Sequence, residues 1–219
     1  MESPDNMVVN CQGSARRLSL VLSEESLWDV INISFGVFAP LAGFMDHDTY
    51  ATTLETCCLP DGSPWSIPIT LPVKEGLARK LARQSEVDLV DKDGVLCAHL
   101  EIADIFQVDF ERDIPRIFGT FDPSHPGVAM EMSRDSFRVG GRIVASDLVS
   151  LRKRTSEFFM SPEEVRRTIE ERSLETVVGF QTRNPPHRAH EYHQRKALHF
   201  ADGLFIQPLI GWKKVGDFT

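Results

Sequence analysis

The residues most able to do chemistry gather in one stretch of the sequence, Gln181–Tyr192. The stretch reads Gln-Thr-Arg-Asn-Pro-Pro-His-Arg-Ala-His-Glu-Tyr. Arg183 offers a planar guanidinium whose paired donors match a tetrahedral oxyanion, and Gln181 can donate from its amide. His187 and His190 are three residues apart, so on a helix both lie on one face and reach the same phosphates. These residue types at this spacing predict an anion-binding site.

Short elements must hold this stretch in place. Thr176–Phe180 is an apolar run typical of a short buried strand, and the polar loop Gln181–Asn184 follows it. We expect Asn184 to cap a helix that begins at the next proline and runs to about His199, with the free N–H groups of its first turn reinforcing the anion site. A second strand is expected at Gly203–Ile210. Together they form a βαβ unit, whose strands should be parallel with a right-handed connection.

Two other interpretations of the stretch stay open. His187, His190 and His193 recur at three-residue steps and could ligate zinc, but the paired-histidine zinc motif spaces its ligands four apart, and no carboxylate or cysteine partner is evident. The polar residues could also be ordinary surface residues at the start of a helix. We favour the anion site, because all these side chains fall together at a strand-to-helix turn, where α/β proteins bind ligands.

The first two-thirds of the chain has the short apolar runs of a strand-rich domain. We predict a strand at Ser66–Val73 with its prolines at edge positions. Glu86–Val90 and Val95–Ile102 should pair as a hairpin, with Gly94 supplying the positive φ of a tight turn. Capping residues and first-turn acids predict helices at Ser23–Val30 and Ser161–Arg172.

Composition and charge exclude several classes of protein. The 219 residues are 42% hydrophobic and 26% charged, which suits one large or two small globular domains. Residues 1–149 hold 12 Lys and Arg against 23 Asp and Glu, whereas residues 150–219 hold 12 against 9. Neither part is as basic as a nucleic-acid-binding domain. No apolar run approaches the roughly 20 residues of a membrane-spanning helix.

The cysteines and the amino terminus indicate a cytoplasmic protein. Cys11, Cys57, Cys58 and Cys97 lack paired spacing, so we expect buried or half-buried reduced thiols rather than disulfides or a zinc cage. The start of the chain, residues 1–6, carries acids where a secretion signal would be basic, and no apolar stretch follows.

The residues Gln181–His190 also resemble the hallmark of the ATP sulfurylase family, Gln-x-Arg-Asn-Pro followed by His-x-x-His. Three more segments extend this resemblance over nearly all of the chain: Phe38–Met45, Thr120–Val128 and Gly203–Phe218. The first has Ala39 where the family more commonly has Ser. From their composition alone we expect Pro40–Met45 to be packing residues and Asp122–Gly127 to form a rigid, buried turn between domains. The pair Lys213 and Lys214 is expected to be solvated at a strand end.

The resemblance implies an α+β protein of two domains. A β-rich PUA-like domain would occupy residues 1–155. Residues 156–219 would begin an α/β, Rossmann-like nucleotidyltransferase domain with its first βαβ unit. Such a unit leaves sheet edges and a face uncovered, so we expect another part of a longer chain, or another chain, to complete it. Family members are commonly homo-oligomers.

The reaction implied by the resemblance joins sulfate to ATP, giving adenosine 5′-phosphosulfate and pyrophosphate, with Mg²⁺ bound to the nucleotide and no protein ligand to a metal assigned. Sulfate attacks the α-phosphorus directly, so positioning and charge stabilisation dominate. By resemblance, Gln181 and Arg183 hold sulfate, and Thr182, Arg183 and Asn184 form the catalytic loop. His187 and His190 would stabilise charge on the phosphates. The residues implied to contact ATP are Gln181, Arg183, Asn184, His187 and His190.

Family members also carry a later Gly-Arg-Asp-His-Ala-Gly segment, which the 219 residues lack. We therefore expect the isolated chain to make no adenosine 5′-phosphosulfate. The alternative function is a non-catalytic PUA-like module that binds an anion, RNA or a protein partner. The acidic balance of residues 1–149 disfavours RNA.

Overall fold

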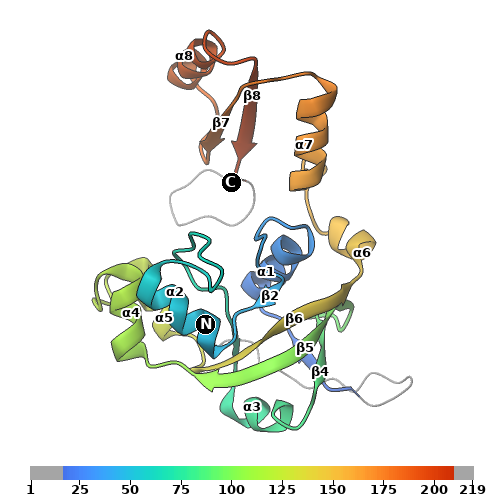
Figure 1. The fold of residues 1–219 in the computed structure, drawn as a ribbon, viewed down its shortest axis with the longest axis vertical. Coiled ribbons are helices and arrows are strands. Elements are labelled where there is room, and N and C mark those ends of the chain that lie inside the picture. The colour runs from blue at the N-terminus through green and yellow to red at the C-terminus, as the bar shows by residue number, and fades with distance from the viewer. Residues whose placement is uncertain (1–16, 210–219) are drawn as a thin grey trace. The chain divides into compact units, whose positions relative to one another are not determined.

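A computed structural model describes residues 17–209 of the chain. The chain divides into two compact units, residues 1–159 and 160–219, which are described separately below (Figure 1). Both units mix helices and strands, which confirms the predicted α+β class.

The first unit is built on a strongly bent sheet in which β5 and β6 are the longest strands (Figure 1). The strand order is β1-β4-β5-β6-β2, and β3 also pairs with β6. The predicted hairpin is confirmed, because β4 and β5 pair antiparallel and Gly94 has a φ of +76° in the turn. The six strands are β1 (Ser19–Val21), β2 (Gly43–Phe44), β3 (Leu71–Val73), β4 (Glu86–Val90), β5 (Leu96–Gln107) and β6 (Phe137–Ser146).

Helices pack around this sheet and close its core. The predicted helix after Ser23 is confirmed, with the Ser23 hydroxyl accepting a hydrogen bond from the Ser26 N–H at 3.1 Å. Val30, Val73 and Leu100 are among the fully buried apolar residues of the main core. The sequence predicted one helix in this unit, whereas the described part contains α1 (Glu24–Ser34), α2 (His47–Thr56), α3 (Glu75–Leu81), α4 (Phe110–Phe118), α5 (Pro126–Met132) and α6 (Leu148–Arg152).

The strand predicted at Ser66–Val73 is shorter than expected. Only Leu71–Val73 forms β3, which pairs antiparallel with β6. Pro68 has no N–H to donate to a ladder, and the carbonyl oxygen of Ile69 accepts instead from the Met45 N–H at 3.0 Å. The pattern indicated the right element but overestimated its length.

The segment Pro40–Met45 packs as predicted only at its end: Gly43, Phe44 and Met45 are buried, whereas Pro40 and Ala42 are exposed. Phe44 and Met45 are 3% and 1% exposed. Gly43 lies where β2 meets β6, and a Cβ at this position would come within 1.9 Å of the Gly141 carbonyl oxygen. This close approach explains why glycine occupies the position.

The segment Asp122–Gly127 does not form a buried turn between domains, so that prediction was wrong. Residues 121–126 are exposed and lie within the first unit. His125 instead caps α5, and its Nδ1 accepts a hydrogen bond from the Val128 N–H at 3.4 Å. Proline and glycine here shape a surface turn and the start of a helix.

The second unit contains the predicted βαβ arrangement. Its elements are α7 (Pro162–Glu171), β7 (Val177–Thr182), α8 (Arg188–Ala197) and β8 (Gly203–Pro208). Ser161 and Glu164 form a reciprocal capping box at the start of α7, as expected for that sequence. The strands β7 and β8 are parallel, in register from Val177 opposite Gly203 to Thr182 opposite Pro208.

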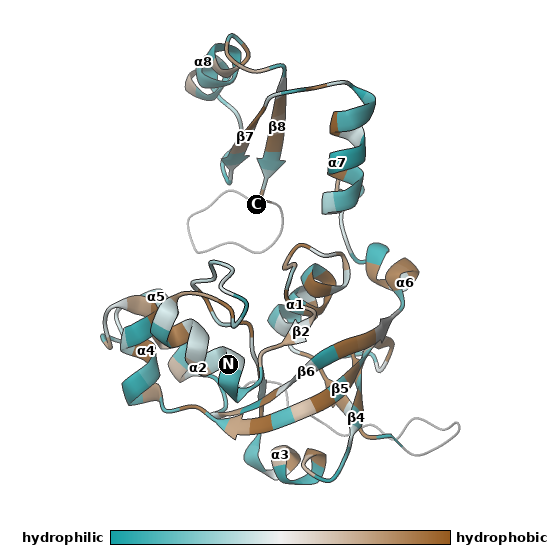
Figure 2. Ribbon diagram, viewed as in Figure 1, coloured by the Kyte–Doolittle hydropathy of each residue, from teal (hydrophilic) through white to brown (hydrophobic). Residues whose placement is uncertain are grey.

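The prediction that the strand at 176–180 is buried was wrong. Thr182 is the one buried residue of β7, and Val178 is 37% exposed. Within residues 17–209, β7 and β8 pair only with each other, so the sheet has no further strand to cover it. Figure 2 shows both strands changing from apolar to hydrophilic towards their carboxyl ends.

The cysteines of the described part are free thiols. Cys97 is buried, Cys58 is half-buried and Cys57 is exposed, the last differing from the expected burial. Cys11 lies outside the described residues. No helix between residues 17 and 209 is long and apolar enough to cross a membrane.

Candidate functional site

The candidate site begins at the carboxyl end of β7, which extends two residues further than predicted. Gln181 and Thr182 belong to the strand rather than to the loop, opposite Gln207 and Pro208 of β8. The Leu209 N–H donates to the Thr182 carbonyl oxygen at 2.8 Å and continues the pairing past β8. Parallel strands ending side by side place the loop at the edge where α/β proteins bind ligands.

Thr182 fixes the loop that follows. Its hydroxyl donates to the Asn184 carbonyl oxygen at 2.9 Å and accepts from the Asn184 N–H at 3.1 Å. Thr182 is 9% exposed, whereas Gln181, Arg183 and Asn184 are exposed. The buried threonine therefore holds the backbone of the loop, and its polar neighbours present their side chains to solvent.

The helix begins later than the sequence predicted. Asn184 is not its N-cap; His187 is, and α8 starts at Arg188. Asn184 and Pro185 each precede a proline, and a residue before proline is pushed away from helical φ and ψ. The chain therefore stays extended through the two prolines. The Nδ1 of His187 accepts a hydrogen bond from the Ala189 N–H at 3.3 Å and so caps the helix.

The structure brings together the two histidines predicted to share a site. The rings of His187 and His190 are stacked, with centroids 3.9 Å apart and planes at 25°. Phe180 of β7 contacts His190 edge-on, at 5.6 Å between centroids. His187 thus reaches its partner from the N-cap position rather than from the helix itself.

The charge of this region suits an anion. Arg183 and Arg188 lie within a few residues of the stacked rings in the sequence, and both are exposed. The nearest acid in the sequence, Glu191, accepts a hydrogen bond from Arg195 at 2.9 Å, which offsets its charge. The surrounding groups are mainly hydrogen-bond donors, the kind that oxyanions of sulfate and phosphate require.

The three histidines at positions 187, 190 and 193 do not gather around one point in the described part of the chain. His193 is exposed and contacts Tyr192 edge-on, at 5.9 Å between ring centroids. Between residues 17 and 209 no three His, Cys, Asp or Glu side chains are grouped so that they could hold a metal ion. The stacked histidines lack the carboxylate or thiolate partners of a protein metal site.

Sequence reasoning missed two further features of this unit. The Oδ2 of Asp202 accepts hydrogen bonds from the N–H and the hydroxyl of Thr176, each at 2.8 Å, and joins the starts of β7 and β8. Gln194 lies one turn after His190 on α8, with its side-chain nitrogen buried. The four-residue spacing of His190 and Gln194 was the available signal for the second feature.

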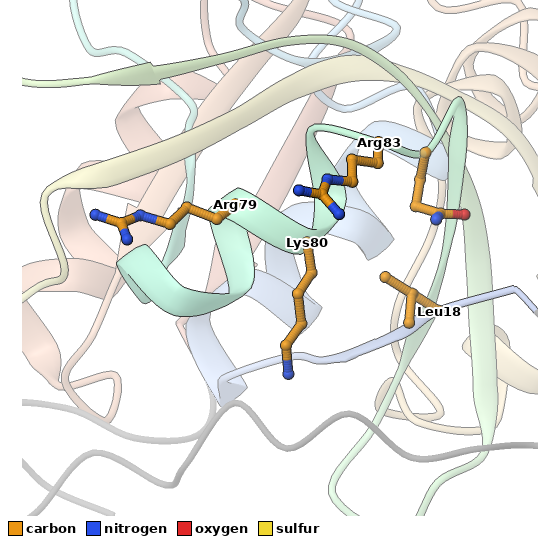
Figure 3. Close-up of a pocket in the computed structure, with 5 residues that line it drawn as sticks. Leu18, Arg79, Lys80 and Arg83 are labelled. Carbon is orange, nitrogen blue, oxygen red and sulfur yellow. The ribbon is translucent and has the colours of Figure 1, made fainter.

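A basic hollow of about 370 Å³ lies at the end of α3 in the first unit (Figure 3). Its cationic side chains are Arg79, Lys80 and Arg83. They point in different directions in Figure 3, and Arg79 is paired with Glu75 at 2.5 Å. Cations at the carboxyl end of a helix are favoured by its dipole. The hollow therefore lacks the converging cations that an anion site would need.

Two of the expected residues cannot be placed. Lys213 and Lys214 lie outside the described residues, as do Ile210, the last residue of the predicted strand, and the rest of the segment Gly203–Phe218 beyond it. The site described above consists of residues from β7, its loop and α8.

Comparison with known proteins agrees with the division of the chain. Residues 3–148 match the family model described as a PUA-like domain, and residues 156–219 match the model described as ATP-sulfurylase. The hexameric APS kinase from Thiobacillus denitrificans is similar in structure, with a TM-score of 0.62 and 22% identity over 91% of this chain and 35% of that one. At this identity the likeness concerns the fold alone.

Curated relatives share more of the sequence. A sulfate adenylyltransferase of Carboxydothermus hydrogenoformans is 40% identical over 200 residues, which are 91% of this chain and 52% of the relative. One of Hyperthermus butylicus is 40% identical over 191 residues, 87% of this chain and 48% of the relative. The chain spans about half the length of the curated relatives that it matches. It belongs to the PUA-like domain family, and the predicted resemblance to ATP sulfurylases is confirmed over about nine-tenths of its length.

Proposed function

We propose that the protein carrying this chain is a sulfate adenylyltransferase, which makes adenosine 5′-phosphosulfate and pyrophosphate from ATP and sulfate. The observation that carries the proposal is the turn from β7 to α8, where Gln181, Arg183 and Asn184 precede the stacked pair His187 and His190. The similarity to curated sulfate adenylyltransferases supports the assignment of this reaction to the turn.

The chemistry fits side chains that bind and polarise rather than attack. A sulfate oxygen displaces pyrophosphate from the α-phosphorus in line. A new oxygen–phosphorus bond forms, the bond to the β-phosphate oxygen breaks, and pyrophosphate leaves with its electron pair. No protein nucleophile is needed, so orientation and charge stabilisation supply the rate enhancement.

Each predicted residue has a role in this proposal. Gln181 and Arg183 hold sulfate, because an amide and a guanidinium fork donate to a tetrahedral anion. Thr182 keeps the catalytic loop in shape through its two hydrogen bonds with Asn184, and Asn184 contacts ATP. His187 and His190 donate to the phosphates of ATP as charge builds on the departing pyrophosphate.

The side-chain chemistry also bears on Mg²⁺. The exposed side chains of Gln181, Arg183 and Asn184 can all donate and carry no negative charge, and Glu191 is engaged by Arg195, so these residues fit phosphate oxygens better than a bare cation. We propose that Mg²⁺ arrives bound to ATP, where it neutralises phosphate charge. The substrates would be ATP and sulfate. The protein would act in the cytoplasm and would assemble as a homo-oligomer.

We also propose a domain boundary at residues 155 and 156. The PUA-like domain would precede it, and the first βαβ unit of the nucleotidyltransferase domain would follow it. The exposed faces of β7 and β8 support the expectation that the 219-residue chain by itself does not turn over substrate.

The proposed function is tested by replacing Arg183 with alanine. We expect the chain to bind sulfate and pyrophosphate, and R183A to weaken that binding by about 10- to 100-fold, as loss of charge-assisted hydrogen bonds predicts. Isothermal titration calorimetry measures the affinities. R166A is the matched control, because Arg166 is an exposed arginine of α7 outside the loop.

The same variants separate binding from catalysis. In the protein at the length of its relatives, R183A should abolish sulfate-dependent release of pyrophosphate from ATP, and R166A should leave it unchanged. Turnover that persists in R183A would refute the role of Arg183, and a wild-type protein without sulfate-dependent release would refute the proposed reaction.

A further inference from the structure

Two buried polar atoms on α8 have no hydrogen-bond partner among residues 17–209. They are Nδ1 of His190 and Nε2 of Gln194. The residues are four apart in a helix, so their side chains lie on the same face, one turn from each other. An unpaired buried donor or acceptor is costly, and such groups in native proteins are few. Two of them on adjacent turns of one helix call for a common explanation.

The two atoms are chemically complementary. Nε2 of Gln194 is an amide nitrogen and can only donate a hydrogen bond. Nδ1 of a neutral histidine accepts one when the ring proton is on Nε2. The side chain of Gln194 has enough rotatable bonds for its amide to turn towards His190 without moving the helix backbone.

The stacked partner shows what such a donor does. Nδ1 of His187 accepts the Ala189 N–H at 3.3 Å, so a neutral His187 ring carries its proton on Nε2. His190 lies nearly parallel to that ring, yet the other ring in contact with it is Phe180, which has no hydrogen-bonding group. His190 therefore needs its donor from another side chain.

We propose that Gln194 is a positioning residue that holds the proton of His190 on Nε2. The proposal rests on the proposed function, in which His190 donates to the phosphates. Because Nδ1 is buried, Nε2 is the ring nitrogen left to meet a ligand. With Gln194 donating to Nδ1, the outward nitrogen is a donor rather than an acceptor, as a phosphate oxygen requires.

An amide serves this purpose in both charge states of the ring. Its nitrogen donates to Nδ1 of the neutral ring, and its oxygen, after the amide turns over, accepts from the Nδ1–H of the charged ring. In each case Nε2 keeps its proton. Leucine, of similar size, offers neither group, whereas glutamate retains an acceptor for the charged ring only.

Nuclear magnetic resonance of ring nitrogens in the 219-residue chain tests the proposal without any catalytic assay. Spectra are recorded well above the ordinary histidine pKa of about 6.5, where the rings are neutral. We expect the Nε2–H tautomer of His190 in the unaltered chain. In Q194L its ratio to the Nδ1–H tautomer should fall about fivefold, the change that corresponds to one lost neutral hydrogen bond. His187, held by the backbone, should keep its tautomer.

A second experiment alters the histidine instead of the glutamine and covers the case in which Q194L does not fold. H190F removes the acceptor, and H193F is the matched control at an exposed position of the same helix. The side-chain amide signals of Gln194 should move in H190F and stay in place in H193F. An unchanged His190 tautomer in Q194L, or equal Gln194 signals in H190F and H193F, overturns the proposal. Neither readout depends on sulfate or ATP, so failure of the proposed function would leave the result interpretable.

Discussion

The buried ion pair of the first unit offers the sharpest test of the fold. The Arg138 side chain on β6 is fully buried, and its Nη2 donates to Glu131 at 2.7 Å. Its remaining donors go to the Thr70 hydroxyl and to backbone carbonyl oxygens. Burial lowers the pKa of Arg138 below its usual value, although Glu131 opposes this shift. Glutamine at position 131 would keep an acceptor but remove the charge.

The cost of E131Q follows from these contacts. Removing one partner of a buried pair costs about 3–5 kcal/mol, and the retained amide oxygen places this variant near about 3 kcal/mol. Glu131 also pairs with Arg134 at 2.5 Å, but Arg134 keeps its contact with Glu25, so that loss adds under about 1 kcal/mol. The total of about 3–4 kcal/mol corresponds to a roughly 150- to 900-fold increase in the equilibrium constant of unfolding.

Native-state hydrogen exchange at the β6 amides measures this change within the first unit alone. E101Q is the matched control. Glu101 of β5 pairs with Arg142, which is on β6 like Arg138, but the side chains of Glu101 and Arg142 are both more than half exposed. We expect E101Q to change the free energy of opening at the β6 amides, as measured by hydrogen exchange, by less than about 1 kcal/mol. If E131Q destabilises β6 no more than E101Q does, the reasoning from burial is refuted. The double variant E131L/R138M should recover only part of the loss, because the Thr70 hydroxyl and the backbone carbonyl oxygens then lose their donor.

Two further predictions concern a buried carboxyl and a tight contact. Burial, and then Glu25, raise the pKa of Asp29 to about 7, against the opposing effect of Arg134. Protonated Asp29 therefore stabilises the fold at low pH, and this contribution is lost as pH rises from about 4 through 7. D29N should raise the free energy of unfolding at pH 8 by about 2 kcal/mol and have little effect at pH 4. Urea titrations at the two pH values measure this difference, and an equal effect at both would contradict the prediction. G203A should destabilise the second unit by about 1 kcal/mol, because the added Cβ would lie 2.7 Å from Cδ1 of Leu174, the end of a half-buried side chain that must shift. G179A, with open space around its Cβ, is the control, and equal exchange of the β8 amides in both variants would contradict this.

Much of the fold followed from local patterns. Ser23 and Ser161 cap the predicted helices, and Gly94 turns the predicted hairpin, because capping and turn formation depend on a few adjacent residues. Most helices of the first unit were missed, since they are short and depend on packing against the sheet. The exposure of β7 was also missed, because burial depends on which strands lie beside it.

The candidate site divides in the same way. Residue types and spacing predicted an anion site at this turn, its family resemblance and the pairing of His187 with His190, and the stacked rings confirm the pairing. The sequence also predicted Asn184 as the N-cap. Pro186 disfavours a helical conformation of Pro185, so the helix begins later and His187 is its N-cap. That Thr182 holds the loop together, and that Nδ1 of His190 is buried, depends on side-chain directions. The sequence by itself determined which groups can bind an anion, and only the tertiary structure decided which atoms they present, because hydrogen-bond geometry is set in three dimensions.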